Sequence, residues 1–448
     1  MKVLLVRPLL LNMLAITGAI DCEPLELEYL YTACREMGVE AVLYDGITET
    51  RPFSAVLERE RPEVVAITGT ITQENRMRRY AALARRILPG CRVVLGGVHA
   101  QLNYRRLYFP EVDFVQRGES MEEWQALLRL IREGGDPAAI GSLCWREGGT
   151  FRENPYQPGD ITRLPIPLRP ALEAHPEAFR YLDYSRVATM KTAVSCPFSC
   201  NFCYGTHLHG GRYQARPAAL VAEELAGLPA QTVFFVDSDF LVDDKRVWEL
   251  VGLLRQRDIR KTYICYARAD FIARQPVLIA ALAEVGFRCF LVGLESLSGE
   301  RLAAYEKGVT TDVNEDCLRV LRDCGADCVA LMMADPAFTR EDFRRLYAWA
   351  RDRGLKYVSV QVYTPIPPTP LYVEKEAELL DRRPEKWDLA HLLLKPAHMT
   401  RVGFTLRHRL LMARLYLLGW RRGAYRFVTP RFVAGRIAAW WKRRRTLR

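Results

Sequence analysis

The chain has 448 residues, of which 49% are hydrophobic and 26% are charged, and its formal net charge is +11. This hydrophobic content excludes a disordered protein, and the length predicts two or three domains rather than a single core. Twelve cysteines spread over this length exclude a small, disulfide-framed secreted protein. We expect no signal peptide, because Arg7 and Pro8 interrupt the first apolar run, and no apolar run reaches the ~18–20 residues of a membrane span. These features predict a protein of the reducing cytoplasm.

The positive charge is concentrated at the C-terminal end. Residues 389–448 contain 15 Lys or Arg and no Asp or Glu, which leaves 49 basic and 53 acidic residues to the first 388. Apolar residues alternate with arginine over 406–419 and 432–441. This pattern is typical of a helix that makes peripheral contact with an anionic membrane, which for a cytoplasmic protein would be the inner face of the cell membrane. It is equally typical of a helix that packs on a domain and has a solvated basic face. Nucleic acid is not expected as a partner, because no RNA-binding module accompanies the basic residues.

The first 140 residues alternate short apolar strands with amphipathic helices. Strands are predicted at 3–6, 40–43, 64–68, 93–95 and 113–116, and helices at 25–37, 51–61, 74–88 and 121–131. This order is typical of an α/β domain with a doubly wound, Rossmann or flavodoxin-like parallel sheet, which binds ligands beyond the carboxyl ends of its strands. The residues expected at that rim are Thr68, Gly69, Thr70, Gly96, Gly97, His99, Ala100, Arg117, Gly118 and Glu119.

A second α/β region follows a segment rich in Gly and Pro. Residues 141–185 are predicted to form a linker, and strands are expected at 233–236, 263–266, 289–292, 329–332 and 358–362. Five or six strand–helix units are fewer than the eight of a complete barrel, which needs about 250 residues. The sequence therefore predicts domains at 1–140 and 186–375, followed by a basic helical region at 376–448.

Three cysteines lie close together in the second region. Cys196, Cys200 and Cys203 have the spacing C-x3-C-x2-C, and Phe202 precedes the last of them. Thiolates are the usual ligands of iron–sulfur clusters, and three of them on one loop can hold three corners of a [4Fe–4S] cube while the fourth iron stays open. The alternative is a set of buried or zinc-binding cysteines, since His207 and His209 are near enough to complete a zinc site.

This cysteine motif resembles the signature of the radical S-adenosylmethionine (SAM) superfamily. The resemblance implies a partial (β/α)6 barrel, a [4Fe–4S] cluster on the three cysteines, SAM on the open iron, and an external electron donor such as flavodoxin or ferredoxin. Asp237 and Asp239 follow the second strand of the region, Arg268 the third and Glu295 the next. Similar segments hold SAM in the family, which assigns Phe202, Asp237, Arg268 and Glu295 to its binding, with the arginine fork on the carboxylate.

The N-terminal domain resembles the cobalamin-binding domain of B12-dependent radical SAM enzymes. The matching segments are 23–27, 64–70, 93–100 and 117–119. The resemblance assigns cobalamin to the rim, specifically to Thr68, Thr70, Gly96, Gly97, His99, Gly118 and Glu119. His99 is expected to line the pocket rather than bind cobalt, because the Asp-x-His-x-x-Gly pattern is absent. A flavodoxin-like domain that binds nothing is the alternative.

The two resemblances cover residues 1–370 and imply a cobalamin-dependent radical SAM C-methyltransferase. Its expected substrate is an unactivated carbon of a small molecule, a pigment or a lipid. One alternative is radical SAM chemistry without methyl transfer, such as cyclisation, rearrangement or hydrogen abstraction. The other is a non-catalytic protein that responds to B12 or metal. Cys317, Cys324 and Cys328 look like a second cluster site, but they fall on a predicted helix, turn and strand, so we expect them to pack in the core.

Overall fold

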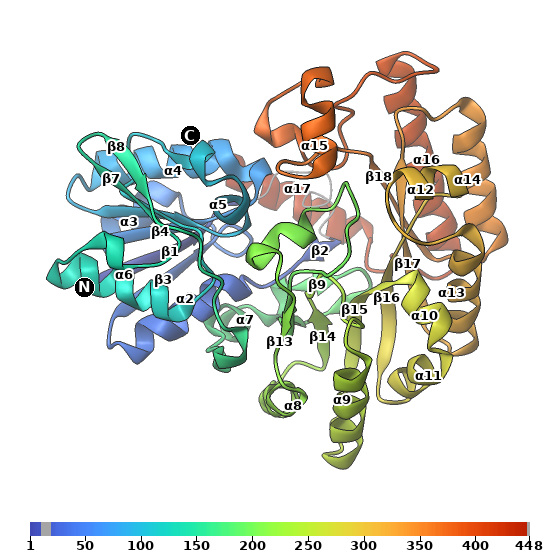
Figure 1. Cartoon of the computed structure of the whole chain (residues 1–448), viewed down its shortest axis with the longest axis horizontal. Coiled ribbons are helices and arrows are strands. Elements are labelled where there is room, and N and C mark those ends of the chain that lie inside the picture. The colour runs from blue at the N-terminus through green and yellow to red at the C-terminus, as the bar shows by residue number, and fades with distance from the viewer. Residues whose placement is uncertain (10–18, 446–448) are drawn as a thin grey trace. The chain divides into compact units, whose positions relative to one another are not determined.

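A computed structural model describes residues 1–9 and 19–445 and divides the chain into two compact units (Figure 1). The first unit comprises Met1–Arg180, His207–Arg212 and Thr429–Arg448, and the second comprises Tyr181–Thr206 and Tyr213–Val428. Among the described residues, no helix combines the length and the hydropathy of a membrane span.

The first unit contains a seven-stranded sheet of order β3-β1-β4-β5-β6-β7-β8. Its strands are β1 (Lys2–Arg7), β3 (Glu40–Asp45), β4 (Val64–Thr68), β5 (Arg92–Gly96), β6 (Phe114–Gln116), β7 (Leu143–Glu147) and β8 (Thr150–Glu153). Its main helices are α2 (Leu25–Glu36), α3 (Phe53–Glu60), α4 (Glu74–Ile87), α5 (Val98–Asn103) and α6 (Met121–Glu133). The first five strands in the order are parallel, and every residue of β4 is buried. The predicted doubly wound sheet is therefore confirmed, and buried parallel strands explain its uniformly apolar segments.

The sheet extends into the segment that the sequence predicted as a linker. Strands β7 and β8 form an antiparallel hairpin, and β7 pairs antiparallel with β6. Gly148 and Gly149 connect them with φ of 56° and 88°, the left-handed backbone that two-residue hairpin turns need. Phe151 then stacks on Tyr108 at a centroid distance of 4.0 Å. Residues 143–153 thus belong to the sheet and do not link two domains.

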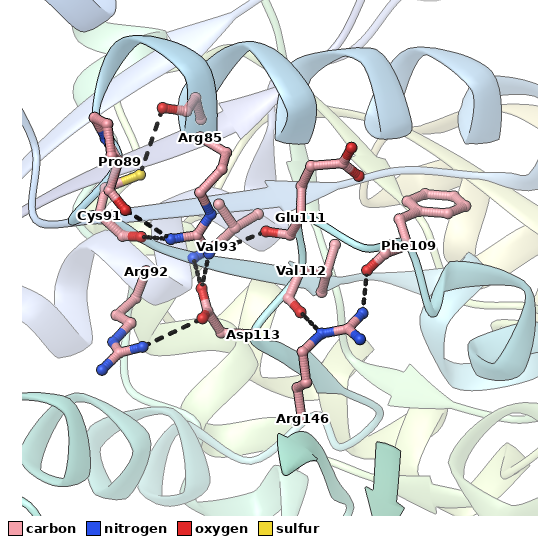
Figure 2. Close-up of polar contacts among 11 residues, drawn as sticks. Arg85, Pro89, Cys91, Arg92, Val93, Phe109, Glu111, Val112, Asp113 and Arg146 are labelled. Atoms are coloured by element: carbon pink, nitrogen blue, oxygen red, sulfur yellow. Dashed lines mark hydrogen bonds and ion pairs between the residues drawn. The ribbon is translucent and has the colours of Figure 1, made fainter. Parts of the chain in front are cut away.

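A polar network joins the amino ends of β5 and β6 (Figure 2). Arg85 of α4 donates to the carbonyl of Cys91 at 2.8 Å and to the Asp113 carboxylate at 2.6 Å. The same carboxylate accepts the backbone N–H of Val93 at 2.7 Å, and Arg146 of β7 donates to the carbonyl of Val112 at 3.1 Å. This network holds together the amino ends of β5 and β6. The predicted ligand rim lies at the opposite ends of these strands, so its polar groups take no part in the network.

The second unit contains six parallel strands in sequence order, β11-β14-β15-β16-β17-β18. They are β11 (Val187–Met190), β14 (Thr232–Phe235), β15 (Thr262–Arg268), β16 (Phe287–Glu295), β17 (Asp327–Ala334) and β18 (Tyr357–Val362). The intervening helices are α8 (Ala218–Gly227), α9 (Asp244–Gln256), α10 (Ala269–Arg274), α11 (Pro276–Glu284), α12 (Gly299–Ala304), α13 (Thr311–Asp323) and α14 (Arg340–Asp352). Figure 1 shows α10, α11, α13 and α14 along one side of these strands. The predicted partial (β/α)6 barrel is confirmed.

The C-terminal region forms two long helices, α16 (Arg401–Arg421) in the second unit and α17 (Pro430–Arg445) in the first. Helix α16 packs against β18 and α14. Its His408 lies 2.8 Å from the Val360 carbonyl, and a side chain at Gly419 would overlap the carbonyl of Lys356. Arg422 then donates to the carbonyls of Ala350 and Leu355 at the end of α14, at 3.2 and 2.9 Å. Helix α16 is thus an integral part of the second unit.

Candidate functional site

The three cysteines of the motif occupy a single loop of the second unit. The loop leaves β12 (Ala193–Val194), which pairs antiparallel with β13 (Gln214–Ala215). Cys200 is buried, Cys196 and Cys203 are half-buried, and all three are free of disulfides. The N–H of Cys203 donates to the Cys200 carbonyl at 3.1 Å, and the N–H of Gly205 points to the Cys203 Sγ at 3.4 Å. Backbone bonds therefore give the loop its shape and leave the thiols available as ligands.

The neighbouring elements anchor this loop through Asn201 and Phe202. Asn201 donates its N–H to the Tyr305 carbonyl at 3.3 Å, and its own carbonyl accepts the N–H of Leu371, in α15 (Pro370–Lys375), at 3.0 Å. The ring of Phe202 packs edge-on against Tyr305 and Tyr363, at centroid distances of 5.9 and 6.5 Å. Phe202, which is predicted to bind a cofactor, thus packs the cysteine loop against the rest of the second unit. Its contact with SAM stays a prediction.

Arg268, the last residue of β15, lies against the cysteine loop. Its side chain is buried, its Nη1 is 3.7 Å from the Cys200 Sγ, and its guanidinium stacks over the Phe198 ring at 3.8 Å. Its other nitrogens donate to Asp270 at 2.9 Å and to the Lys307 carbonyl at 2.8 Å. A guanidinium so oriented places a fixed positive charge beside the Cys200 sulfur, next to the position predicted for the cluster.

Glu295 ends β16 in a left-handed conformation, with φ of 62°. Its Oε1 lies 3.1 Å from the Lys307 Nζ, and both side chains are buried. Burial by itself lowers the pKa of Lys307, but the charges of Glu295 and Cys200 outweigh it and raise the pKa above its usual value. The lysine is therefore charged at neutral pH, and it forms a buried ion pair at the carboxyl end of the barrel strands.

The two aspartates after β14 have different surroundings. Asp237 accepts the N–H groups of Thr192 and Ala193 at 2.6 and 2.9 Å, together with the Thr192 hydroxyl. Asp239 is equally buried, but its Oδ1 accepts only the Leu241 N–H, at 3.2 Å, and its Oδ2 has no hydrogen-bond partner. Burial raises the pKa of Asp239 to about 6, although the charges of Arg268 and Lys307 lower it. Asp237 therefore holds the turn before the cysteine loop, whereas Asp239 keeps an acceptor for a ligand.

The donor set fits an iron–sulfur cluster. Burial raises the pKa of Cys196 to about 11 and also raises that of Cys203, so the bare thiols are neutral and a metal has to displace their protons. Among the described residues, no group of His, Cys, Asp and Glu side chains is arranged around a single ion. The three thiols of a cluster need no such arrangement, because each binds a different iron. His209, named for the zinc alternative, bonds instead to Glu119 at 3.2 Å, within the first unit.

The predicted rim of the first unit forms at the carboxyl ends of β4 and β5. Thr68 and Gly96 are paired neighbours in the sheet, and the N–H of His99 donates to the Gly69 carbonyl at 3.1 Å. Gly97 has φ of 86°, and a Cβ on it would overlap the Thr68 hydroxyl. Thr70, Gly97 and Val98 are exposed. Gly97 is thus needed because it lies against Thr68 at the end of the neighbouring strand. The backbone beside it is exposed, and a bulky cofactor could approach it closely.

His99 is turned into the protein. Its side chain is 0% exposed, and its Nε2 lies 2.8 Å from Glu74, which also binds Arg106 at 2.6 Å. The Nδ1 is buried without a hydrogen-bond partner. Because the ring is enclosed by its own unit, it has no face open to a cobalt ion, and its predicted place in the pocket wall stays a prediction.

Gly118 and Glu119 complete the rim beyond β6. A side chain at Gly118 would meet the end of the Glu123 side chain, which would have to move aside. Glu119 accepts from Gln101 at 2.5 Å, and Gln101 also lies 3.2 Å from the Tyr156 hydroxyl. Side-chain contacts thus join the segments that follow β5 and β6, and the binding of cobalamin by Gly118 and Glu119 stays a prediction.

Comparison with known proteins gives matches to both units in the expected order. The family model of the B12 binding domain matches residues 12–128, and the model of the radical SAM superfamily matches residues 190–350. The chain belongs to the cobalamin-dependent radical SAM enzymes. Its cofactors are a [4Fe–4S] cluster, SAM and cobalamin.

Similar proteins include methyltransferases. This radical SAM enzyme is 26% identical over 416 residues to an uncharacterized methyltransferase of Pyrococcus horikoshii, covering 89% of each chain. It is 25% identical over 384 residues to the hopanoid C-3 methylase of Methylococcus capsulatus, covering 83% of this chain and 72% of that protein. The solved structure of the radical SAM methyltransferase TsrM from Kitasatospora setae, with cobalamin and a [4Fe–4S] cluster bound, has a TM-score of 0.70 and 18% identity over 93% of this chain and 90% of that one. This structural likeness establishes the shared fold.

Lys307 is the site residue that sequence reasoning missed. It follows α12 rather than a strand, so the rule that active-site residues of barrels follow strands does not find it. Its burial, with 7% of the residue exposed, and its contact with Glu295 appear only in the structure, so the sequence holds no signal for it.

Proposed function

We propose that this enzyme is a C-methyltransferase acting on an unactivated carbon of a small molecule, a pigment or a lipid. The name of the hopanoid C-3 methylase, which this chain resembles over most of its length, states methylation at carbon. When bound, the cluster and SAM supply a 5′-deoxyadenosyl radical that removes hydrogen from a substrate, and cobalamin supplies the methyl group.

The observation that carries the proposal is the buried, half-partnered carboxylate of Asp239, which lies near the cysteine loop and the charges of Arg268 and Lys307. Asp239 interacts electrostatically with Cys196, Arg268 and Lys307. A buried carboxylate with an unpartnered oxygen is costly, and a cationic ligand that donates to it removes the cost. The ammonium group of SAM is such a ligand. We therefore assign the amino-group contact to Asp239 and give Asp237 the role of positioning the loop.

The remaining predicted roles follow the same division. Arg268 sits beside Cys200 with its positive charge fixed, which suits it to hold a carboxylate next to the cluster. Glu295 and Lys307 supply the opposite charges of an ion pair that a ligand with both signs can exchange with. Thr70 and Gly97 offer an open edge to cobalamin in the first unit. A flavodoxin or ferredoxin in the cytoplasm would supply the electrons.

The fate of SAM tests this function. The full chain would be reconstituted without oxygen, with iron, sulfide and hydroxocobalamin, and given SAM and a strong reductant. We expect both 5′-deoxyadenosine and S-adenosylhomocysteine by mass spectrometry, with only the second product lost when cobalamin is omitted. Deoxyadenosine without S-adenosylhomocysteine in cobalamin-loaded protein would contradict methyl transfer. No SAM cleavage with any reductant would point to the non-catalytic alternative.

A further inference from the structure

Helix α16 carries apolar residues on two opposite faces. One face is buried on the second unit through Phe404, His408, Leu411, Leu415 and Gly419. The other is a row that we call the outer stripe, with exposed fractions of 68% at Val402, 61% at Leu406, 60% at Leu410, 48% at Leu417 and 48% at Trp420. Single exposed leucines are ordinary on protein surfaces, but a continuous row of five large apolar side chains marks an interaction site.

The spacing of the outer stripe makes it one continuous surface. Successive members are separated by four, four, seven and three residues, which are the intervals that return to the same side of an α-helix. The stripe extends over 19 residues from Val402 to Trp420, or roughly 27 Å along the helix axis. It points away from the packed face, because the buried residues fall between its members at the opposite angle.

Positive charge borders the outer stripe. Arg409 and Arg421 are exposed beside it, and Arg414 lies over the Tyr347 ring of α14 at 3.7 Å. Within the described part of the chain, none of these three arginines forms an ion pair, and residues 389–448 contain no Asp or Glu. The apolar row thus lies in a basic field that the helix itself does not neutralise.

We propose that the outer stripe of α16 lies on the surface of an anionic lipid bilayer. An apolar row flanked by arginines can make two kinds of contact with such a surface. Its aliphatic and indole groups enter the boundary of the acyl chains, and its guanidinium groups bind the anionic headgroups. A second copy of the chain fits less well. A two-fold interface would set the same patch against itself and bring its arginines together without a carboxylate to pair with them.

The proposal concerns a surface and not the chemistry of the cofactors, so it stands apart from the proposed function. Its consequence is that the second unit would work at a membrane, where apolar substrates are concentrated. The outer face of α16 would insert without unfolding, since its opposite face already packs against β18 and α14.

Vesicle flotation tests the proposal with the reconstituted full chain. The probes are vesicles of phosphatidylcholine alone and of phosphatidylcholine with phosphatidylglycerol. The test variant is Leu406→Ser with Leu410→Ser, and the charge variant is Arg409→Gln with Arg421→Gln. The matched control is Val277→Ser with Val373→Ser, which changes two side chains of the same unit that are 71% and 73% exposed but lie on α11 and α15. Thermal melts and the mass in solution are recorded for all four proteins.

We expect the wild type to float with the anionic vesicles and the Leu406, Leu410 variant to bind them at least about tenfold more weakly. The charge variant should lose the dependence on phosphatidylglycerol and salt, whereas the control should bind as the wild type does, with all melts unchanged. Three results would overturn the proposal: a wild type that does not float, a leucine variant that floats equally well, or a wild-type dimer that the leucine variant converts to a monomer.

Discussion

The strand ends that we assign to the cofactors carry different kinds of residue in the two units. In the first unit, β4 and β5 end in Thr68, Gly96 and Gly97, which offer backbone and a hydroxyl. In the second, the strand ends carry Asp239, Arg268 and Glu295, which are charged and buried. A large cofactor is held by shape over an open backbone edge, whereas a small zwitterion next to a cluster needs fixed charges of both signs. This contrast supports our proposal that the two rims hold different cofactors.

Cys203→Ala should abolish binding of the cluster without affecting binding of cobalamin. Cys203→Ala removes one of three thiolates, and we expect the iron retained after desalting to fall by about tenfold or more, since two thiolates hold a cluster poorly. Cobalt binding should be unchanged, because the first unit keeps its rim. Cys324→Ala is the matched control, because Cys324 is a half-buried cysteine outside the loop. Equal iron in Cys203→Ala and wild type would disprove the cluster assignment.

A second comparison separates the two aspartates of one strand end. Asp239→Asn should weaken SAM binding about tenfold or more, because it removes a charged acceptor, and it should leave the melting temperature unchanged or raised. Asp237→Asn should instead lower the free energy of unfolding by about 2 kcal/mol, because three donors of Thr192 and Ala193 depend on that carboxylate. Calorimetric SAM titration and thermal melts check both. The reverse pattern would return the SAM contact to Asp237.

Gly97→Ala tests the backbone edge of the first unit. The new methyl group overlaps the Thr68 hydroxyl at a left-handed φ, so we expect a loss of about 2–3 kcal/mol in stability and weaker cobalamin binding at unchanged iron content. Gly90→Ala is the control, because no atom lies within 4 Å of its Cβ position. Adding Thr68→Ala to Gly97→Ala should restore part of the stability. If it restores none, the overlap is not the cause.

The buried carboxyl of Glu28 in the first unit should make the stability of the protein depend on pH. Glu28 is 0% exposed, and its Oε1 accepts the N–H of Ala171 at 3.2 Å, while Arg169 bonds to the adjacent Glu23 at 2.5 Å. Burial, and then the charge of Glu23, raises the pKa of Glu28 well above its usual value. The protonated form is therefore favoured in the folded state, and its contribution to stability is present at low pH and is lost as the pH rises above the usual carboxyl range.

A glutamine at position 28 is neutral at every pH, so Glu28→Gln should reduce the loss of stability as the pH rises. We expect it to match the wild type near about pH 5 and to exceed its free energy of unfolding by about 1–3 kcal/mol near about pH 8.5. Thermal melts over this range provide the measurement. A difference that does not grow with pH would mean that Glu28 is ionised in the folded protein.

Apolar periodicity in the sequence is enough to locate most elements of the fold. Strand β4 was predicted at its observed bounds and α2 to within one residue, because buried parallel strands and amphipathic helices have strong patterns. The hairpin of β7 and β8 was missed, since its Gly and Pro content resembles a linker. A signal was present all the same: the pair Gly148-Gly149 between two short segments that each contain an aromatic residue is typical of a hairpin turn.

The candidate site is only partly readable from the sequence. The cysteines share one loop, so their spacing alone brings them together. Asp237 and Asp239 both follow β14, yet Asp237 accepts three donors from Thr192 and Ala193, whereas Asp239 accepts only the Leu241 N–H, and that difference depends on where Thr192 lies. Lys307 comes close to Glu295 only through the path of the chain after α12. Contacts between distant segments leave no local pattern.

The most direct test of the dual-cofactor account is a metal count on the reconstituted full chain. The protein would be loaded without oxygen with iron, sulfide and hydroxocobalamin, desalted, and analysed for iron and cobalt per chain. The account predicts about four irons and about one cobalt. Iron without cobalt would contradict it and would leave a radical SAM enzyme whose first unit binds no cobalamin.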